Sequence, residues 1–294
     1  MEFGDFALYL STEKRQSVHT VTAYLGDLRQ FADWCHENLS ISRVEEVDKM
    51  TVRSFVAFLV SGGQAPRTVH RKIASLNAWF RFLQKTGLSA SNPARGIAKP
   101  KLPSRLPTVV EESRLADVKV PQKPEKESLR DNLVIKLLYE TGMRRAELIG
   151  MHVHDVDYQS CTIKVLGKRN KMRIIPVTKP MTDSIREYRL WRDTLEHAAS
   201  HDFLMVSSSG KPMTEKLVYR IVTGYLSGVT TMKKRSPHVL RHSFATHMLN
   251  AGADLNVIKE ILGHASLAAT QVYTHNSIEK LKAVHWLHHP RNIS

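Results

Sequence analysis

Residues 237–244 are Pro237-His238-Val239-Leu240-Arg241-His242-Ser243-Phe244, and this stretch indicates how the second half of the chain folds. Proline suits the first turn of a helix, and a spacing of three residues places His238 and Arg241 on one helical face. Leu240 and Phe244 can then turn toward a core. The stretch therefore predicts a helix that buries one side and presents a polar pair from its beginning.

A second helix and a hairpin accompany this segment. Asp254 is a suitable cap for the next helix, and Gly263 is a suitable end for it, directly before His264. Between residues 162 and 177 the apolar period changes to two, with glycine and asparagine in the middle. This pattern predicts a hairpin with Lys168 at or near its tip.

The first half of the chain shows helical periodicity only. Apolar residues recur at helical spacing over 21–35, over 52–60 after a possible Thr51 cap, and over 69–83 after Pro66. A short run at 203–206 in the second half predicts one more strand. The expected fold class is mainly α with a small antiparallel sheet (α+β).

A basic, proline-rich segment separates the two halves. Residues 92–107 contain four prolines and four basic residues and have no periodic apolar face. We therefore predict a helical domain over residues 1–91, an extended linker over 92–107, and a mixed α and β domain over 108–294.

The composition narrows the class of partner. Lys and Arg outnumber Asp and Glu by 43 to 28, and the excess covers both halves, which favours nucleic acid over an anionic membrane surface. No apolar run of about 18 residues and no signal-peptide pattern is visible, so we expect a cytoplasmic protein without a membrane partner. Cys35 and Cys161 lie among apolar neighbours and predict reduced thiols rather than a disulfide or a thiolate metal site.

Four basic residues begin the third predicted helix: Arg67, His70, Arg71 and Lys72. Cations at a helix N-terminus oppose the macrodipole, and a bound phosphate would relieve that repulsion. We predict DNA contacts for Arg67, Arg71 and Lys72. A solvated basic face is an equally good interpretation of the same charges.

Five short motifs follow one another in the second half. They are Gly142-Met143-Arg144-Arg145-Ala146-Glu147-Leu148, Gly167-Lys168, His238-x-x-Arg241-His242, Leu262-Gly263-His264 and Tyr273-Thr274-His275. In this order and spacing they resemble the motif set of the tyrosine recombinase (phage integrase) family, over roughly Thr108 to Arg291. The helical first half is similar in pattern to the SAM-like core-binding domain of that family, so the resemblance implies a DNA-binding domain over residues 1–91 and a catalytic domain over 108–294.

The resemblance implies a reaction that needs neither metal, cofactor nor ATP. Tyr273 would attack a DNA backbone phosphodiester and form a 3'-phosphotyrosyl bond, which keeps the bond energy for rejoining. Arg144 and Arg241 would hold the nonbridging oxygens and offset the charge of the transition state, because a guanidinium fork matches a phosphate.

Four further residues receive roles from the same resemblance. Lys168 would protonate the leaving 5'-oxygen, with Lys171 as a nearby competitor. His238 would accept the tyrosine proton or bind the phosphate, and His264 would donate to the phosphate. Glu147 would orient an arginine without taking part in proton transfer.

The resemblance also implies an assembly. Within the family, the length and the single helical domain are most similar to Xer-type recombinases, which resolve chromosome dimers at cell division. A cyclic homo- or hetero-tetramer on a specific core site of double-stranded DNA is the expected form. The apolar stripe Ile278, Leu281, Val284 and Leu287 would pack into the next protomer. A second recombinase and a cell-division DNA translocase stay open as partners.

Several alternatives remain compatible with these residues. A mobile-element integrase shares the motifs, and a type IB topoisomerase would use the same residues without pairing two sites. A non-enzymatic basic DNA-binding protein would need none of them. A zinc hydrolase could use His238, His242, His247 and His264, although no nearby carboxylate pair completes such a site.

Overall fold

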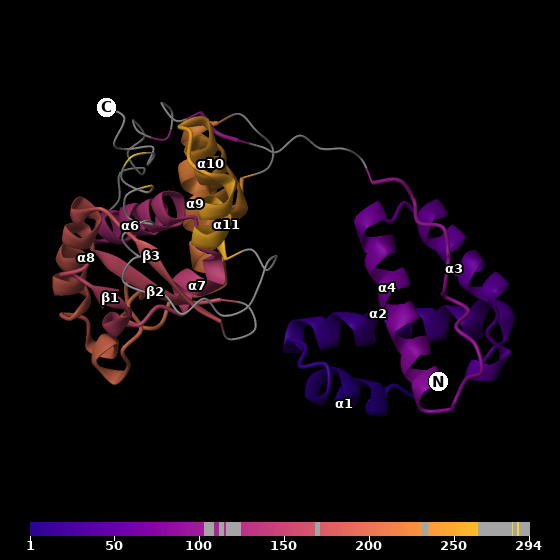
Figure 1. Cartoon of the computed structure of the whole chain (residues 1–294). Helices are drawn as coiled ribbons and strands as arrows, with labels where there is room; N and C mark the ends of the chain where they lie inside the picture. Colours follow the sequence, from indigo (N-terminus) through magenta and orange to yellow (C-terminus); the bar gives the residue numbers. More distant parts are fainter. Residues whose placement is uncertain are drawn as a thin grey trace. The chain divides into compact units, whose positions relative to one another are not determined.

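The computed structural model describes residues 1–102, 109–111, 115, 125–167, 171–230, 235–263, 284 and 287. The chain divides into two compact units, Met1–Arg105 and Leu106–Ser294 (Figure 1). Within the described ranges, no helix is both long and apolar enough to cross a membrane.

The first unit is helical. Its elements are α1 (Gly4–Thr12), α2 (Val18–Leu39), a 3-10 turn (Val44–Glu46), α3 (Lys49–Ser61) and α4 (Pro66–Lys85). The three predicted helices correspond to α2, α3 and α4 and are confirmed. The predicted Thr51 cap is wrong, because α3 begins earlier: the Asp48 side chain accepts hydrogen bonds from the Thr51 amide at 2.7 Å and the Thr51 hydroxyl at 2.8 Å.

Aromatic side chains fill the core of the first unit. Phe31 of α2 lies 5.1 Å from Phe55 of α3, ring centre to ring centre, and Trp79 and Phe80 of α4 are fully buried. Each such side chain contributes about 1.5–3 kcal/mol through burial. The amphipathic faces of α2, α3 and α4 therefore account for this unit without any strand.

The proline-rich segment does not begin as an extended linker. Ala94 and Ile97 are buried in the core of the first unit, and His70 Nε2 donates a hydrogen bond to the Pro100 carbonyl at 2.7 Å. Burial of Ala94 and Ile97 favours packing of this stretch against the first unit, although its proline and basic content predicts an extended linker. Residues 103–107 of the predicted linker lie outside the described residues.

The second unit combines helices with a small sheet. The helices are α6 (Glu125–Thr141), α7 (Arg145–Ile149), α8 (Lys179–Arg192), α9 (Glu215–Val229), α10 (Pro237–Asn250) and α11 (Leu255–Leu262), and the strands are β1 (Val156–Asp157), β2 (Thr162–Leu166) and β3 (Met172–Pro176). Short 3-10 turns occur at Val153–Asp155 and Glu196–Ser200. The predicted fold class, mainly α with a small antiparallel sheet, is confirmed.

The sheet has the order β1-β2-β3 and is antiparallel throughout. Ile163 pairs with Ile175, and Val165 pairs with Arg173, so the predicted hairpin is confirmed. The strand predicted at 203–206 is wrong, since this run makes only isolated bridges at its two ends. Three consecutive buried side chains, Leu204 to Val206, occupy the core there, whereas a strand of a half-buried sheet would alternate.

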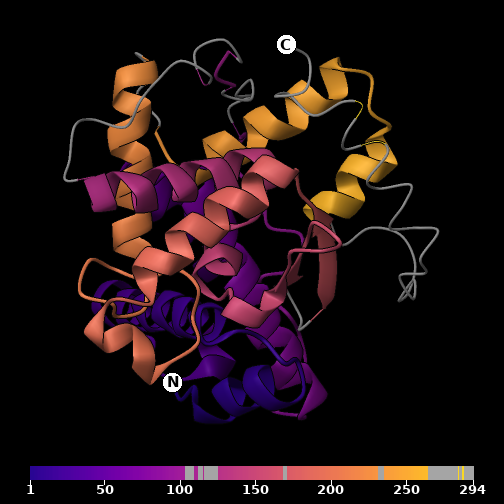
Figure 2. The same cartoon turned by 90° about the vertical axis from the view of Figure 1, so that its left-hand side faces the viewer.

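The second core is built around α6. This helix packs against α8, α9 and α10, which lie around it in Figure 2. Leu133, Val134, Leu137 and Leu138 of α6 are all buried, as are Leu240 and Phe244 of α10. The α7 helix also contacts β2, and α11 contacts β3, so both of these short helices lie against the sheet.

Candidate active site

Two glycine turns bring the site together. Gly142, between α6 and α7, has φ +59°, and Gly263, which ends α11 as predicted, has φ +64°. A Cβ atom on Gly142 would lie 2.6 Å from both Leu262 and Phe244. Glycine is therefore required at this turn by conformation and by space, and the close approach places Arg144 beside the end of α11.

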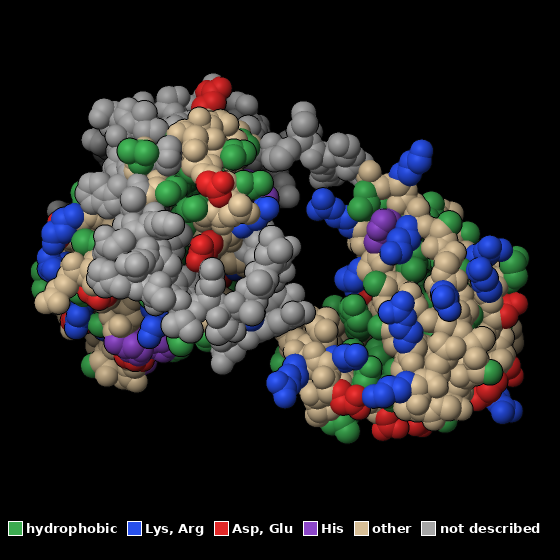
Figure 3. Space-filling model, in the orientation of Figure 1, with side chains coloured by type: hydrophobic (Ala, Val, Ile, Leu, Met, Phe, Trp, Pro, Cys, Tyr) green, Lys and Arg blue, Asp and Glu red, His purple; other side chains and the backbone are tan. Residues whose placement is uncertain are grey.

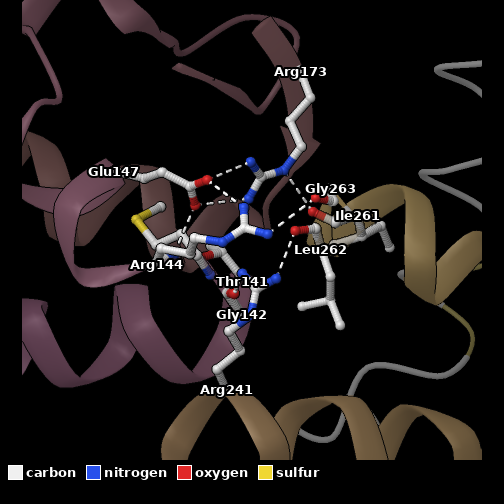
Figure 4. Close-up of polar contacts among 10 residues, drawn as sticks. Thr141, Gly142, Arg144, Glu147, Arg173, Arg241, Ile261, Leu262 and Gly263 are labelled. Carbon is white, nitrogen blue, oxygen red and sulfur yellow. Dashed lines mark hydrogen bonds and ion pairs between the residues drawn. The ribbon is translucent and has the colours of Figure 1, made fainter. Parts of the chain in front are cut away.

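Arg144 is the N-cap residue of α7 and projects into the site (Figure 4). Its Nη1 donates to Glu147 Oε1 at 2.8 Å, and its Nη2 donates to the Gly263 carbonyl at 3.0 Å. The side chain keeps 32% exposure. Arg144 is thus held by two partners and still reaches the surface.

Glu147 is the buried carboxylate of the cluster. Its two oxygens accept from Arg173 Nη1 at 2.7 Å and Nη2 at 2.9 Å, and Oε2 also accepts from the Arg144 amide at 2.6 Å. Burial alone would raise the pKa of the Glu147 carboxyl, but the hydrogen bonds and charge of Arg173, together with the bonds from Arg144, outweigh burial and lower it. Glu147 is therefore ionised at neutral pH.

Arg241 reaches the site from the first turns of α10. It is buried, and its two terminal nitrogens donate to the carbonyls of Gly142 and Leu262, the latter at 2.6 Å. These carbonyls belong to the two turns described above, so Arg241 ties the end of α6 to the end of α11. Figure 4 shows the Arg144 guanidinium between those of Arg173 and Arg241.

The cluster carries more positive than negative charge. Among the residues that the structure describes, three guanidinium groups gather here with one carboxylate: Arg144 and Arg173 bind Glu147, and Arg241 lies beyond Arg144 (Figure 4). Burial, together with the charges of Arg144 and Arg173, lowers the pKa of Arg241 to about 10, and the charge of Glu147 opposes this shift. Arg241 stays protonated at neutral pH, and a bound anion would offset the repulsion. The geometry and the charge together describe a phosphate site.

His238 lies one helical turn before Arg241 in α10 and is exposed. The structure thus brings together Arg144, Glu147 and Arg241 and places His238 on the same helix as Arg241. The predicted Lys168, His264 and Tyr273 lie outside the described residues. Of the predicted C-terminal stripe, the described Val284 packs against the core of the second unit and Leu287 is exposed.

Arg173 is a site residue that the motifs did not supply. It belongs to β3 and is buried, and its Nε donates to the Ile261 carbonyl at 2.7 Å. A signal was present in the sequence, since residue 173 shares the face of Ile175 and Val177 at a spacing of two. A charged residue at an inward strand position requires a buried partner.

The predicted DNA contacts on α4 differ among themselves. Arg67 is exposed (Figure 3 shows Lys and Arg side chains spread over this unit), and Arg71 is exposed but bonds to Asp27. The prediction for Lys72 is corrected, because this side chain is buried and its Nζ donates to Asp27 Oδ1 at 3.0 Å and to Gln30. Lys72 joins α4 to α2.

Of the four histidines in the zinc alternative, the structure describes three, and these differ in their surroundings. His247 is buried and hydrogen-bonded to the Tyr139 hydroxyl at 2.8 Å, whereas His238 and His242 are exposed. In the part of the chain that the structure describes, no three His, Cys, Asp or Glu side chains are grouped so as to hold a metal ion.

Fold and site together describe a two-unit protein with a cluster of arginines suited to a phosphate, and comparisons with known proteins identify its family. The Phage integrase family model matches residues 111–280, and the Phage integrase, N-terminal SAM-like domain model matches residues 3–87. The chain belongs to the phage integrase family of tyrosine recombinases, enzymes that break and rejoin DNA.

Within the family, the chain is similar to proteins named "Tyrosine recombinase XerC". It is 37% identical to that of Pelobacter propionicus over 97% of this chain and 94% of the relative, and 35% identical to that of Chlorobaculum parvum over 97% and 93%. The XerH site-specific recombinase bound to difH substrate superposes with a TM-score of 0.68 at 22% identity, covering 93% of this chain and 80% of that one. The structural likeness supports the fold.

Proposed function

We propose that this protein is a Xer-type site-specific recombinase that cuts and rejoins DNA through a 3'-phosphotyrosyl intermediate and resolves chromosome dimers. The observation that carries the proposal is the cluster formed by the guanidinium groups of Arg144, Arg173 and Arg241 with the Glu147 carboxylate. Arg144 is oriented by Glu147 and the Gly263 carbonyl, and Arg241 by the Gly142 and Leu262 carbonyls. The names of the curated relatives support the Xer type.

The proposed reaction is an in-line exchange at phosphorus. The Tyr273 oxygen forms a bond to phosphorus as the bond from phosphorus to the 5'-oxygen breaks. The tyrosine proton passes to His238 or to solvent, and Lys168 supplies a proton to the leaving 5'-oxygen. Arg144 and Arg241 hold the nonbridging oxygens, where positioned donors stabilise the developing charge without later rearrangement, and His264 donates to the same phosphate. The reverse exchange rejoins a strand, so no cofactor takes part.

The proposed partners follow from this function. They are a specific core site in double-stranded DNA, three further recombinase subunits in a cyclic tetramer, and, for dimer resolution, a second recombinase and a cell-division DNA translocase. The XerH neighbour is a complex with its DNA substrate, which supports DNA as the partner. Arg67 and Arg71 are the proposed phosphate contacts of the first unit, and the cytoplasm is the proposed location.

A plasmid with two copies of the candidate chromosomal site in direct repeat tests the function. The protein, with and without a second recombinase of the same cell, should convert the plasmid into two circles, and the Tyr273→Phe variant should not. Relaxation of supercoils at many sequences without exchange would indicate a type IB topoisomerase instead. Integration of a mobile element's own ends, with no activity on the chromosomal site, would indicate the integrase alternative.

A further inference from the structure

Arg173 makes three side-chain hydrogen bonds within the site. Its guanidinium forms a two-bond fork with Glu147, and its Nε binds the Ile261 carbonyl at the end of α11. Because Arg173 belongs to β3, this single side chain joins the hairpin, the Arg144–Glu147 pair and α11. A paired guanidinium fork fixes direction as well as distance.

Two glycines make room for the Arg173 side chain. A Cβ on Gly263 would lie 3.1 Å from Arg173 Nη1, and a Cβ on Gly167 would lie 3.4 Å from the same atom. Gly167 directly precedes Lys168, and Gly263 directly precedes His264. The Arg173 guanidinium therefore packs against Gly167 and Gly263, which directly precede two residues with proposed roles in catalysis.

The Gly167 amide donates to the Lys171 carbonyl at 2.8 Å, which closes the base of the hairpin turn beside Arg173. A buried ion pair adds little net stability compared with well-packed apolar side chains, so stability alone gives a weak reason for an arginine here. Fixing the direction of the hairpin gives a stronger one, because a displacement of about 1 Å at a reacting group can slow a reaction by about 10²-fold.

We propose that Arg173 is a positioning residue for strand cleavage, which fixes the base of the β2–β3 hairpin, and with it the approach of Lys168, relative to Arg144 and Glu147. This rests on the proposed function. Arg173 itself need not touch the DNA, since its three contacts are all within the protein. Its loss affects the protonation of the leaving group more than any other step.

The test compares two nicked substrates that differ in one atom. One carries oxygen and the other sulfur as the 5'-bridging atom of the scissile phosphate, and sulfur leaves without needing protonation. Single-turnover cleavage by Arg173→Met should be slower by about 10²-fold on the oxygen substrate and by about 10-fold on the sulfur substrate. The conservative Arg173→Lys variant should give intermediate rates with the same order.

Arg192, at the end of α8, offers a matched control, because it is a buried arginine with carbonyl partners outside the site. It donates to the Phe203 carbonyl at 2.9 Å and to the His201 carbonyl at 2.8 Å. Arg192→Lys should keep the wild-type ratio of the two rates. The ratio of the rates on the two substrates does not depend on the fraction of protein that is folded. If Arg173→Met does not fold, Arg173→Lys still tests the proposal, because it keeps a cation against Glu147. Equal slowing on both substrates, or wild-type rates, would overturn the proposal. A wild-type protein that cleaves neither substrate would contradict the proposed function instead.

Discussion

At the scale of single residues, the site consists of charges whose directions are fixed by backbone carbonyls. Arg241 is the clearest case, because both of its terminal nitrogens are held by carbonyls of two different turns. Such donors are already oriented before a phosphate arrives, so little reorganisation is needed during the reaction. Their identity as arginines matters as much as their charge.

Arg241→Lys should lower the single-turnover cleavage rate by about 10²–10³-fold, since an ammonium cannot bind both carbonyls and the phosphate in one plane. DNA affinity, measured by fluorescence anisotropy, should change far less. Arg186→Lys on α8 is the control, because Arg186 is exposed and lies over the Tyr158 ring. A cleavage rate within a few-fold of wild type for Arg241→Lys would refute the assigned role.

Glu147 predicts a pH dependence of stability. Its folded-state pKa is lowered, so its contribution is present above the unfolded pKa of about 4.3 and is lost as pH falls through the folded value. At pH 7, Glu147→Gln should reduce the free energy of unfolding by about 3 kcal/mol, because Arg173 then lacks its carboxylate. Urea denaturation from pH 7 to pH 3 should show that the difference in free energy of unfolding between the wild type and Glu147→Gln, the stability gap, narrows below about pH 4. The exposed Glu187→Gln should show no such trend, and a constant gap for Glu147→Gln would contradict the account.

At the scale of elements, the site depends on turns that let helices and the hairpin approach closely. Gly142→Ala should destabilise the second unit by about 2–4 kcal/mol, because the new Cβ meets Phe244 and Leu262 and φ is positive. Gly224→Ala is the matched control, since Gly224 lies within α9 and a Cβ there meets nothing within 4 Å. It should be neutral or stabilising by about 0.5–1 kcal/mol. Equal thermal unfolding curves for the two variants would count against this explanation.

A buried ion pair joins α2 to α4 in the first unit. Asp27 accepts from Lys72 and Arg71, and Asp27→Asn would leave the Lys72 ammonium buried without a carboxylate. Calorimetry of the full chain should show the transition of the first unit weakened by about 3 kcal/mol. The exposed pair of Glu13 and Lys85 gives the control, since Glu13→Gln should change stability by less than about 1 kcal/mol. Similar effects for both variants would show that burial does not matter at Asp27.

At the scale of the whole molecule, periodicity and caps were sufficient to predict most of the elements. Apolar spacing gave α2, α3 and α4, and the change to a period of two gave the β2–β3 hairpin. The strand expected at 203–206 failed because a buried loop can be as apolar as a strand, and only its neighbours distinguish the two.

Predictions about individual side chains were less complete, because they depend on partners far away in the sequence. The sequence predicts a surface cation at Lys72, because its partner Asp27 is forty-five positions away in the chain. The role of Arg173 in the site was not predicted for the same reason, since its partners Glu147 and Ile261 belong to other elements. Arg144, Glu147 and Arg241 were found because their motifs are local, and the structure shows them converging.

The most direct test of the central claim is a denaturing gel of the protein mixed with its candidate DNA site, nicked near the cleavage position to trap the intermediate, in excess EDTA. The account predicts a protein–DNA adduct that survives detergent and is absent for Tyr273→Phe. Cleavage that EDTA abolishes and Tyr273→Phe retains would contradict phosphotyrosyl chemistry and favour a metal-dependent hydrolase.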